Sequence, residues 1–283
     1  MNESTESLLA RGWRLFRQHP RLFASLVFAG GIAGLALSYC FTPVYKADAT
    51  LVPSEEMQAL SQNTLLGGLG GIASLVGGAQ GNKENEAVAV LKSRALTCAY
   101  IETNGLLPIL FHNRWDATAH KWKPGRKIPT VLDGFRDFDN GIRLIVENQK
   151  TGIITISVTW EDPTLAKQWA DGLVRMANDR LRSEAIERSS KNLEYLQGAS
   201  EKTTVTGVKE TIYKLMESEI KKQMISVANV DYAFRVIDPT VVPEKKVFPK
   251  RTLFSGLGAA VGGIAWLLVA MLKDRAAGLK TAG

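Results

Sequence analysis

Two uncharged stretches decide how this chain folds: LFASLVFAGGIAGLALSYCF at residues 22–41 and TLFSGLGAAVGGIAWLLVAML at residues 252–272. Each is about 20 residues long, the length that a helix needs to cross the hydrocarbon of a bilayer. The roughly 200 residues between them carry charges that hydrocarbon excludes. The sequence therefore predicts two transmembrane helices, residues 22–41 and 252–272, and one domain, residues 42–251, displayed on one face of the membrane.

Basic residues in the two short tails predict the orientation of this hairpin. Residues 1–21 contain Arg11, Arg14, Arg17 and Arg21, and residues 273–283 contain Lys273, Arg275 and Lys280. Basic residues close to a membrane span, in short segments, stay in the cytoplasm, whereas a long loop crosses largely regardless of its own charge. We therefore expect both tails to be cytoplasmic and the central domain to be extracytoplasmic.

A cleaved signal peptide is the alternative interpretation of residues 22–41. This apolar core is longer than the about 7–15 residues that are typical of such peptides. A lipoprotein-like box ends at Cys40, but the bulky Tyr39 stands where a small residue is expected, and the Ala47-Asp48-Ala49 motif lies too far from the core. The second apolar stretch also needs a partner if both tails are to lie on one side. The sequence favours two retained spans.

Charge and cysteine content exclude some classes of function. The net charge is +7, and part of it flanks the apolar stretches, which favours attraction to anionic membrane lipids. We expect no nucleic-acid partner, because no basic run alternates with aromatic residues at a spacing that suits stacked bases. The two cysteines, Cys40 and Cys98, are interpreted as small buried hydrophobic residues rather than as a disulfide framework.

The central domain combines strand and helix patterns, so the predicted fold class is α+β. Alternating apolar residues predict strands at 45–52, 142–147, 152–160 and 232–237. Helical spacing predicts a helix at 84–103, ended by Asn104-Gly105, and a short helix at 131–138. The first of these helices is expected to bury one face, formed by Ala87, Val90, Leu91, Ala95 and Cys98.

Two long helical patterns follow the last of the paired strands. Asp162 is a suitable cap and Pro163 a suitable first residue for the first helix. Its apolar residues are Leu165, Trp169, Leu173, Met176, Leu181, Leu193 and Leu196, and the second pattern contains Val208, Ile212, Leu215, Ile220, Met224 and Val227. These stripes are narrow and the other faces are densely charged. The pattern predicts long helices that pack on neighbours, including copies of the same chain.

The glycine-rich tract at residues 65–81 contains a formal G-x-G-x-x-A at residues 68–73. A dinucleotide site needs a preceding strand and a following helix, whereas the preceding residues here are polar and the tract is expected outside the cytoplasm. An apolar loop close to the membrane fits better. We predict no nucleotide or other cofactor.

Residues for catalysis are scarce. His19 lies in a predicted tail, and His112 and His120 alone do not make a catalytic metal site. No G-x-S-x-G nucleophile motif is present. A glycosidase would need two carboxyl groups a few ångströms apart in a cleft, and the spacing of residues along a chain does not define such a pair. We expect no enzyme activity, no catalytic residues and no metal.

Small residues recur four apart in both predicted spans, at Gly30 and Gly34 in the first and at Gly258 and Gly262 in the second. Such faces let helices approach closely in lipid, where no hydrophobic force drives them together. Glycine is also simply common in membrane helices. The occurrence in both spans favours helix–helix packing within a subunit, between subunits or with another membrane protein.

Residues 111–129 are predicted to be irregular, basic and aromatic. Trp115 and Trp122 lie among Arg114 and Lys123 and other basic residues. Flat aromatic faces with nearby donors suit sugar rings and acidic glycans, so these four residues are candidate glycan contacts. The competing interpretation, which we favour, is a surface segment whose tryptophans cover the sheet.

Several short motifs resemble the Wzz-type polysaccharide co-polymerases, the chain-length determinants of bacterial surface polysaccharides. Residues 232–239 read YAFRVIDP, followed by Pro243 and by Pro249-Lys250-Arg251 before the second span. Pro239, Pro243 and Pro249 predict an extended, stiff approach to the membrane. Similar motifs occur at residues 45–47, 91–93 and 162–170.

The resemblance implies an inner-membrane protein with a periplasmic α/β base and a long helical protrusion. It implies a homo-oligomeric ring that sets the modal length of an O-antigen-like glycan, with a membrane polymerase and a lipid-linked glycan as partners. The short region between the two long helical patterns predicts a reduced protrusion, and we expect no kinase after the second span. The alternatives are a component of a polysaccharide exporter or envelope adaptor, and a two-span receptor.

Overall fold

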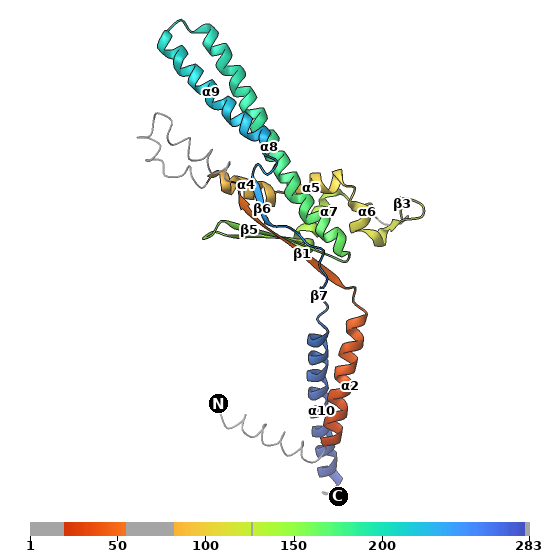
Figure 1. Ribbon diagram of the computed structural model, residues 1–283. Helices are drawn as coiled ribbons and strands as arrows, with labels where there is room; N and C mark the ends of the chain where they lie inside the picture. Colours follow the sequence, from red (N-terminus) through yellow and green to blue (C-terminus); the bar gives the residue numbers. More distant parts are fainter. Residues whose placement is uncertain (1–19, 55–81, 126, 281–283) are drawn as a thin grey trace. The chain divides into compact units, whose positions relative to one another are not determined.

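The computed structural model describes residues 20–54, 82–125 and 127–280 (Figure 1). The chain forms two compact units: Met1–Tyr45 together with Lys245–Gly283, and Lys46–Glu244. The structure therefore separates the segments around the two apolar stretches from the central domain. The glycine-rich tract at 65–81, with its nucleotide-like motif, and the basic residues of the first tail before position 20 lie outside the described residues.

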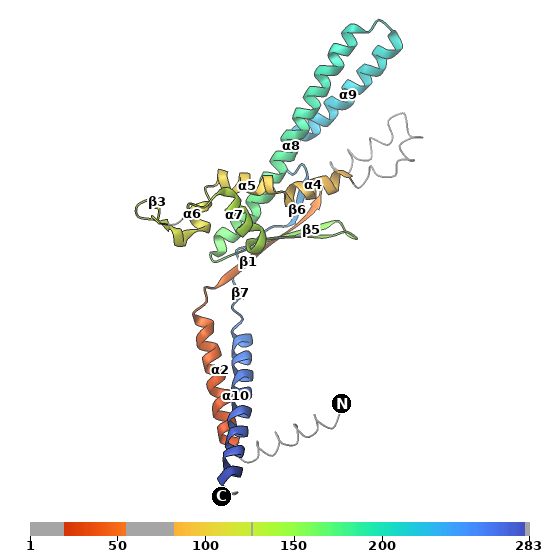
Figure 2. The ribbon, with the colours of Figure 1, turned by 180° about the vertical axis from the view of Figure 1, so that it is seen from behind.

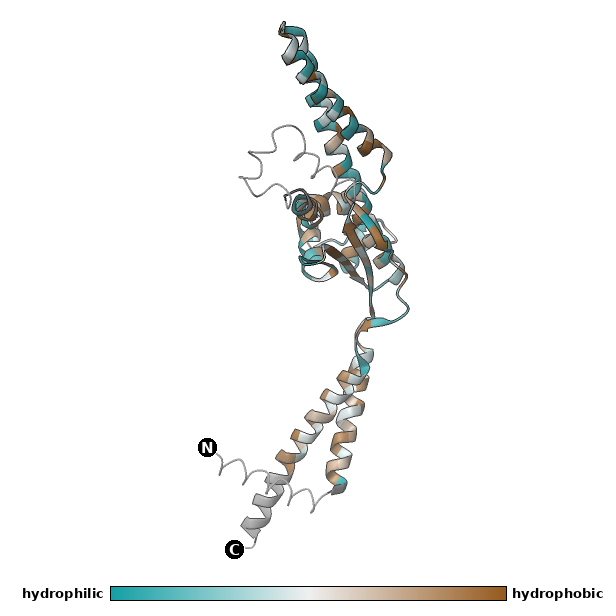
Figure 3. Ribbon diagram, turned by 60° about the vertical axis from the view of Figure 1, so that its left-hand side comes forward, coloured by the Kyte–Doolittle hydropathy of each residue, from teal (hydrophilic) through white to brown (hydrophobic). Residues whose placement is uncertain are grey.

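The first unit contains a pair of apolar helices, α2 (Pro20–Tyr39) and α10 (Arg251–Lys280). Both are long and apolar enough to span a membrane, with a mean hydropathy of 1.8 over Arg21–Tyr39 and over Arg251–Val269. Apolar residues line both helices in Figure 3. Helix α2 ends two residues before the predicted boundary, because Pro43 disfavours helical geometry in the residue before it. Helix α10 contains the whole predicted second stretch.

Strand β7 (Lys246–Phe248) leads into α10 and pairs antiparallel with the first residues of β1 (Val44–Pro53). Val44 is opposite Phe248, and Tyr45 is opposite Lys246. The chain segments that leave α2 and approach α10 are thus held together by a short strand pair.

The second unit is built on a sheet whose strands follow the order β4-β5-β1-β6. Strands β4 (Arg143–Asn148) and β5 (Ile153–Trp160) form an antiparallel hairpin, and β6 (Phe234–Asp238) pairs antiparallel with β1. The predicted strands are confirmed. Alternation in β5 places Ile154, Ile156 and Val158 in the core.

The predicted single helix at residues 84–103 is wrong, because the structure has two helices there. These are α4 (Asn82–Lys92) and α5 (Arg94–Thr103). Ser93 between them is extended (φ −66°, ψ 145°), and its hydroxyl accepts a hydrogen bond from Leu96 N at 3.1 Å. The break turns a different face of α5 inward: Leu96, Thr97, Tyr100 and Ile101 are buried, Ala95 is exposed and Cys98 is half-buried.

Arg143 explains why α4 can end inside the domain. Its buried guanidinium donates to the carbonyl oxygens of Leu91 (3.0 Å) and Lys92 (3.2 Å), the last residues of α4. It also donates to Thr97 Oγ1 (2.7 Å) and Asp139 Oδ1 (2.6 Å). One cationic side chain therefore satisfies two carbonyl groups at the end of α4.

Shorter elements connect α5 to the sheet. They are α6 (Leu107–Leu110), η2 (His112–Arg114), β2 (Trp115–Asp116), β3 (Lys121–Trp122), α7 (Val131–Asp137) and the π-helical turn η3 (Phe138–Ile142). Helix α7 begins with a capping box between Thr130 and Asp133. Asn140-Gly141, a pair that often forms turns, lies within η3.

Helix α8 (Pro163–Lys202) is capped by Asp162, whose carboxylate accepts from the backbone N–H groups of Thr164 and Leu165. Its first half packs on the sheet and on α4 and α5 (Figure 2). There Trp169 and Leu173 join Phe138, Ile156 and Phe234 in one hydrophobic core.

The second half of α8 packs with α9 (Thr206–Ala228) as a helical hairpin, which Figure 1 shows clearly. Within α9 only Ile212 and Ser226 are buried. Much of the predicted apolar stripe of α9 is exposed, namely Val208, Leu215, Ile220, Met224 and Val227. The two long helices of the sequence analysis therefore pack on each other and leave apolar side chains uncovered.

Candidate functional site

The four glycines singled out in the two spans all lie between α2 and α10. A Cβ atom placed on Gly30 or Gly258 would come within 3.0 Å of the backbone carbonyl oxygen of the other residue. A Cβ on Gly34 would meet the carbonyl of Phe254, and one on Gly262 would meet the carbonyl of Leu26. Real Cβ atoms do not approach so closely, so the backbones touch only because these positions lack side chains. The contact that the structure places here is within one chain.

Aromatic residues close both ends of the helix pair. Trp266 is buried and packs edge-on against Phe23, with ring centroids 5.0 Å apart. At the other end Phe41, Phe248 and Phe254 form a cluster with centroid distances of 5.6–5.9 Å. These contacts hold the helix pair together beyond the glycine contact.

The three prolines before α10 differ in their surroundings. Pro239 is exposed, Pro243 is half-buried, and Pro249, next to α10, is buried. Arg251 is the first residue of α10 and Tyr39 is the last residue of α2. The Arg251 guanidinium lies 4.4 Å from the centroid of the Tyr39 ring. The residues between β6 and β7 form neither helix nor strand.

The four candidate glycan contacts come together in a small hairpin. Strands β2 and β3 pair Trp115 with Trp122, whose rings are 4.9 Å apart at 72°. Lys123 N donates to the carbonyl of Arg114 (2.9 Å), and the Lys123 ammonium donates to the carbonyl of Asn113 (3.2 Å). A segment predicted to be irregular is therefore ordered by its tryptophan pair.

The tryptophans of this hairpin do not cover the sheet. Among the described residues, neither Trp115 nor Trp122 belongs to the hydrophobic core or packs against it. Figure 1 shows the β3 hairpin at the end of a projection beyond α6. Each ring is half-buried against the other, while the flanking Arg114 and Lys123 are exposed. The arrangement presents cationic donors around an aromatic pair.

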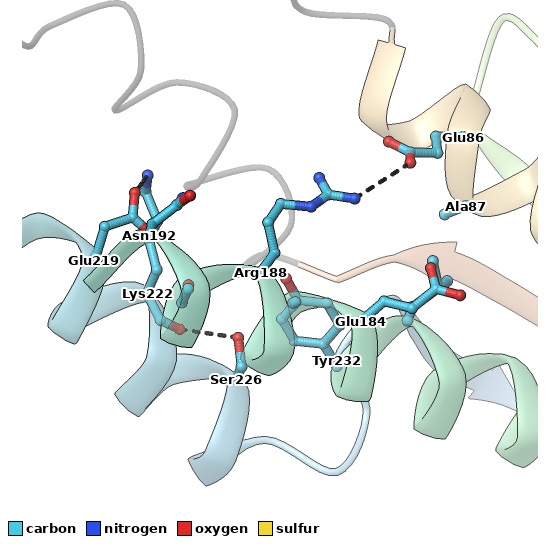
Figure 4. Close-up of a pocket in the computed structure, with 12 residues that line it drawn as sticks. Glu86, Ala87, Glu184, Arg188, Asn192, Glu219, Lys222, Ser226 and Tyr232 are labelled. Carbon is cyan, nitrogen blue, oxygen red and sulfur yellow. Dashed lines mark hydrogen bonds and ion pairs between the residues drawn. The ribbon is translucent and has the colours of Figure 1, made fainter. Parts of the chain in front are cut away.

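A polar cavity of about 140 Å³ lies where α4, α8 and α9 meet (Figure 4). Helix α8 contributes Glu184, Arg188 and Asn192, which are four residues apart and so share one face. Arg188 extends toward Glu86 of α4, with 4.0 Å between the nitrogen and oxygen atoms. Sequence patterns did not single out this cavity, because its residues are charged and look like the solvated face of a long helix.

Glu219 of α9 is the least exposed charged group in this network. Its carboxylate accepts from the Lys222 ammonium at 2.7 Å, and its side chain is 14% exposed. Burial alone would raise the pKa of Glu219. Hydrogen bonds and charge from Lys222, with hydrogen bonds from Ser189 and Asn192 of α8, outweigh burial and hold that pKa below its usual value. The group therefore stays ionised and links the two helices.

A wider groove runs between α5 and α8. Tyr100 fits there against Gly172, where any Cβ would lie within 3.0 Å of the Tyr100 ring atoms. Burial is the main influence on Tyr100 and, with Asp171, raises the pKa of its phenol to about 12, against the opposing effect of Arg175. The tyrosine is thus a neutral packing group at neutral pH.

Two buried polar groups were also missed by sequence patterns. The first is Arg143, whose guanidinium binds the carbonyl groups at the end of α4. Asn178 of α8 is the second: its amide donates to the carbonyl of Phe234 (2.9 Å) and accepts from the N–H groups of Ala233 (3.0 Å) and Phe234 (2.8 Å). This contact explains why β6 begins at Phe234, two residues after the predicted start.

The described part of the chain contains two histidines, His112 and His120, and two cysteines, Cys40 and Cys98. No group of three or more His, Cys, Asp or Glu residues there is placed to hold a metal ion. Both cysteines are free, and Cys40 is exposed rather than buried as predicted because α2 ends just before it.

Comparisons with known proteins give structural similarities only. No family model and no curated protein matches the sequence. A full-length bacterial polysaccharide co-polymerase is similar at a TM-score of 0.44 and 9% identity, over 94% of this chain and 97% of that chain. A fragment of the polysaccharide co-polymerase WzzB from Salmonella Typhimurium is similar at a TM-score of 0.34 and 12% identity, over 73% and 100%.

The Shigella flexneri lipopolysaccharide O-antigen chain-length regulator WzzBSF is similar at a TM-score of 0.29 and 10% identity, over 72% of this chain and 99% of that chain. At TM-scores below 0.5 these similarities do not define a shared fold in detail. The function proposed below therefore rests on the chain's own sequence and contacts.

Proposed function

We propose that this protein is a non-enzymatic regulator of the modal chain length of an O-antigen-like surface polysaccharide. It resides in the inner membrane of a bacterium with both termini in the cytoplasm and the central domain in the periplasm. The observation that carries the proposal is the packing of two apolar helices, α2 and α10, through four glycines. In the sequence these helices precede and follow one α+β domain. The motifs that resemble those of the co-polymerases include residues 45–47, shortly after α2, and residues 249–251, where α10 begins.

The orientation follows from the basic tails. Short basic segments next to spans stay in the cytoplasm, and the long domain is then exported. In that compartment the domain meets a growing glycan rather than a cytoplasmic substrate.

Self-assembly is the second part of the proposal. Apolar side chains along α9, including Met224 (66% exposed) and Val227 (64%), are uncovered in a single chain. Contiguous exposed apolar surface typically marks an interaction site. A ring of copies would cover this face and place several domains around a membrane polymerase.

The tryptophan hairpin supports contact with a lipid-linked glycan. Exposed Arg114 and Lys123 flank the Trp115–Trp122 pair and supply donors for hydroxyl or carboxylate groups. In this proposal the protein holds the glycan or the polymerase and performs no bond-making step.

Deletion of the gene tests the proposal through the length distribution of the surface polysaccharide on a gel. We expect polymer that is still made and exported but has lost its modal length, and restoration by the wild-type gene. Polymer retained inside the cell with unchanged length would instead support the exporter alternative. An unchanged glycan in every respect would support the two-span receptor.

A further inference from the structure

The cavity between α4, α8 and α9 combines a polar wall with an apolar floor. Ala87, Leu181, Ala185 and Tyr232 form the apolar part, and Tyr232 and Leu181 are buried. Glu184, Arg188 and Asn192 lie along one wall on α8; in Figure 4 the Tyr232 ring is near Arg188 and Glu184, and Asn192 is near Glu219. One small ligand can therefore reach a carboxylate that accepts hydrogen bonds (Glu184), a guanidinium that donates them (Arg188) and an amide that does both (Asn192).

The charges of this cavity exclude several ligand classes. Three carboxylates, from Glu86, Glu184 and Glu219, line the cavity with two cations, Arg188 and Lys222, and Glu184 is also paired with Arg180 at 2.9 Å. A phosphate or other strong anion would therefore meet no surplus of positive charge. A divalent cation lacks a ligand set, since no suitable group of His, Cys, Asp and Glu occurs in the described ranges. A purely apolar ligand would leave the charged groups without water or partners.

The volume of the cavity narrows the possible ligand classes further. The cavity of about 140 Å³ is smaller than the roughly 300–1,000 Å³ of pockets that enclose drug-sized molecules. A single uncharged ring with hydroxyl edges and C–H faces fits the volume and the chemistry. Its hydroxyls can exchange hydrogen bonds with Glu184, Arg188 and Asn192, and its apolar face can lie on Ala185 and Tyr232.

We propose that this cavity binds one neutral sugar residue of the glycan whose length the protein sets. The inference rests on the proposed function and adds a ligand class and a site to it. The site differs from the tryptophan hairpin: it lies beside the root of the α8–α9 hairpin, and binding there bridges α4, α8 and α9. A sugar held at this point contacts the same Glu219–Asn192 network that ties α8 to α9.

Equilibrium dialysis tests the site with full-length protein in detergent micelles. The probe is polysaccharide released by mild acid from cells that carry the gene, labelled at its reducing end. In a Trp115→Ala/Trp122→Ala background, which removes the aromatic pair of the hairpin, Ala185→Leu fills the cavity without changing its charge, and we expect it to abolish the remaining binding. Asn192→Ala truncates an exposed side chain, and we expect affinity to fall about fivefold to tenfold.

Glu187→Gln is the matched control for Glu184→Gln. Both glutamates lie on α8 and pair with a basic residue four positions away, Glu187 with Lys191 at 2.7 Å and Glu184 with Arg180 at 2.9 Å. Only Glu184 lines the cavity. We expect Glu184→Gln to weaken binding about fivefold to tenfold and Glu187→Gln to leave it unchanged.

Wild-type protein that does not bind the polysaccharide overturns the inference. So does binding that survives both Ala185→Leu and Asn192→Ala, because the ligand then sits elsewhere. The gene deletion separates this failure from failure of the proposed function. If deletion abolishes the modal length while the cavity variants keep it and bind normally, the function stands and the sugar site falls. If deletion leaves the length unchanged, the function falls whatever binds.

Discussion

Gly258→Ala tests whether backbone contact holds the two apolar helices together. A methyl group at this position would lie 3.0 Å from Gly34 Cα and 3.1 Å from the Gly30 carbonyl carbon, and closer still to the Gly30 carbonyl oxygen. All three are backbone atoms of α2, so no side chain can rotate aside. The helices must separate by about 1 Å along the contact to restore an ordinary van der Waals distance to this oxygen.

The expected cost follows from two opposing effects. Overpacking in a tight contact costs about 1–3 kcal/mol. Replacing a helical glycine with alanine gains roughly 0.5–1 kcal/mol. The net change is a loss of up to about 2.5 kcal/mol. Gly256→Ala is the matched control: it lies in the same helix and has no neighbouring atom within 4 Å, so only the gain applies. The two variants are therefore expected to change stability in opposite directions.

Pyrene excimer emission measures the separation of the helices. In a Cys98→Ala background, one pyrene is attached to Cys40 and one to Leu253→Cys; both side chains are exposed and lie next to the Phe41–Phe254 contact. Titration of the mixed micelles with SDS gives the midpoint at which the excimer is lost. Equal midpoints for Gly258→Ala and Gly256→Ala, or a higher midpoint for Gly258→Ala, would refute the reasoning.

Three further predictions concern the central domain. Arg143→Met removes a buried cation that satisfies two helix-end carbonyls, and we expect about 2–4 kcal/mol of destabilisation in denaturant titrations; Asp139→Asn, at a half-exposed partner, should cost under about 1 kcal/mol. Ser93→Ala removes the cap of α5 and should cost about 1 kcal/mol in the same titrations; a loss below about 0.3 kcal/mol would contradict the capping role. Because burial raises the pKa of Tyr100 from 10.0 to about 12, its contribution to stability is complete below pH 10 and is lost as pH rises toward 12. Tyr100→Phe should reduce this alkaline loss, and thermal melts with an unchanged pH profile would contradict it.

The sequence predicts the elements whose residues repeat strongly. The apolar spans, the β4–β5 hairpin and the start of α8 at Asp162-Pro163 all carry local signals, namely length, alternation and a cap. The four span glycines also follow from spacing, and the structure places them in one contact within the chain. Whether they also contact other chains stays a prediction.

What the sequence could not predict depends on contacts between distant residues. Ser93 lies in a segment of good helical spacing. The helix breaks there because Arg143, 50 positions later, binds the carbonyl groups of Leu91 and Lys92, which have lost their partners within the helix. The polar cavity could not be predicted from the sequence for the same reason. Glu184, Asn192 and Glu219 look like ordinary surface charges until the packing of α9 on α8 brings them together.

Glycine packing between α2 and α10 has a consequence for how this protein would choose its neighbours in the membrane. The four contact glycines are already used inside the chain, whereas the outward surface of the pair carries bulky side chains beside open positions such as Gly256: Phe28, Ile32, Leu257 and Val261 are each at least half exposed. Partner specificity can therefore change at these bulky positions while the pairing of the helices stays intact. We expect adaptation to a different membrane partner to change these outward-facing residues and to leave the four contact glycines unchanged.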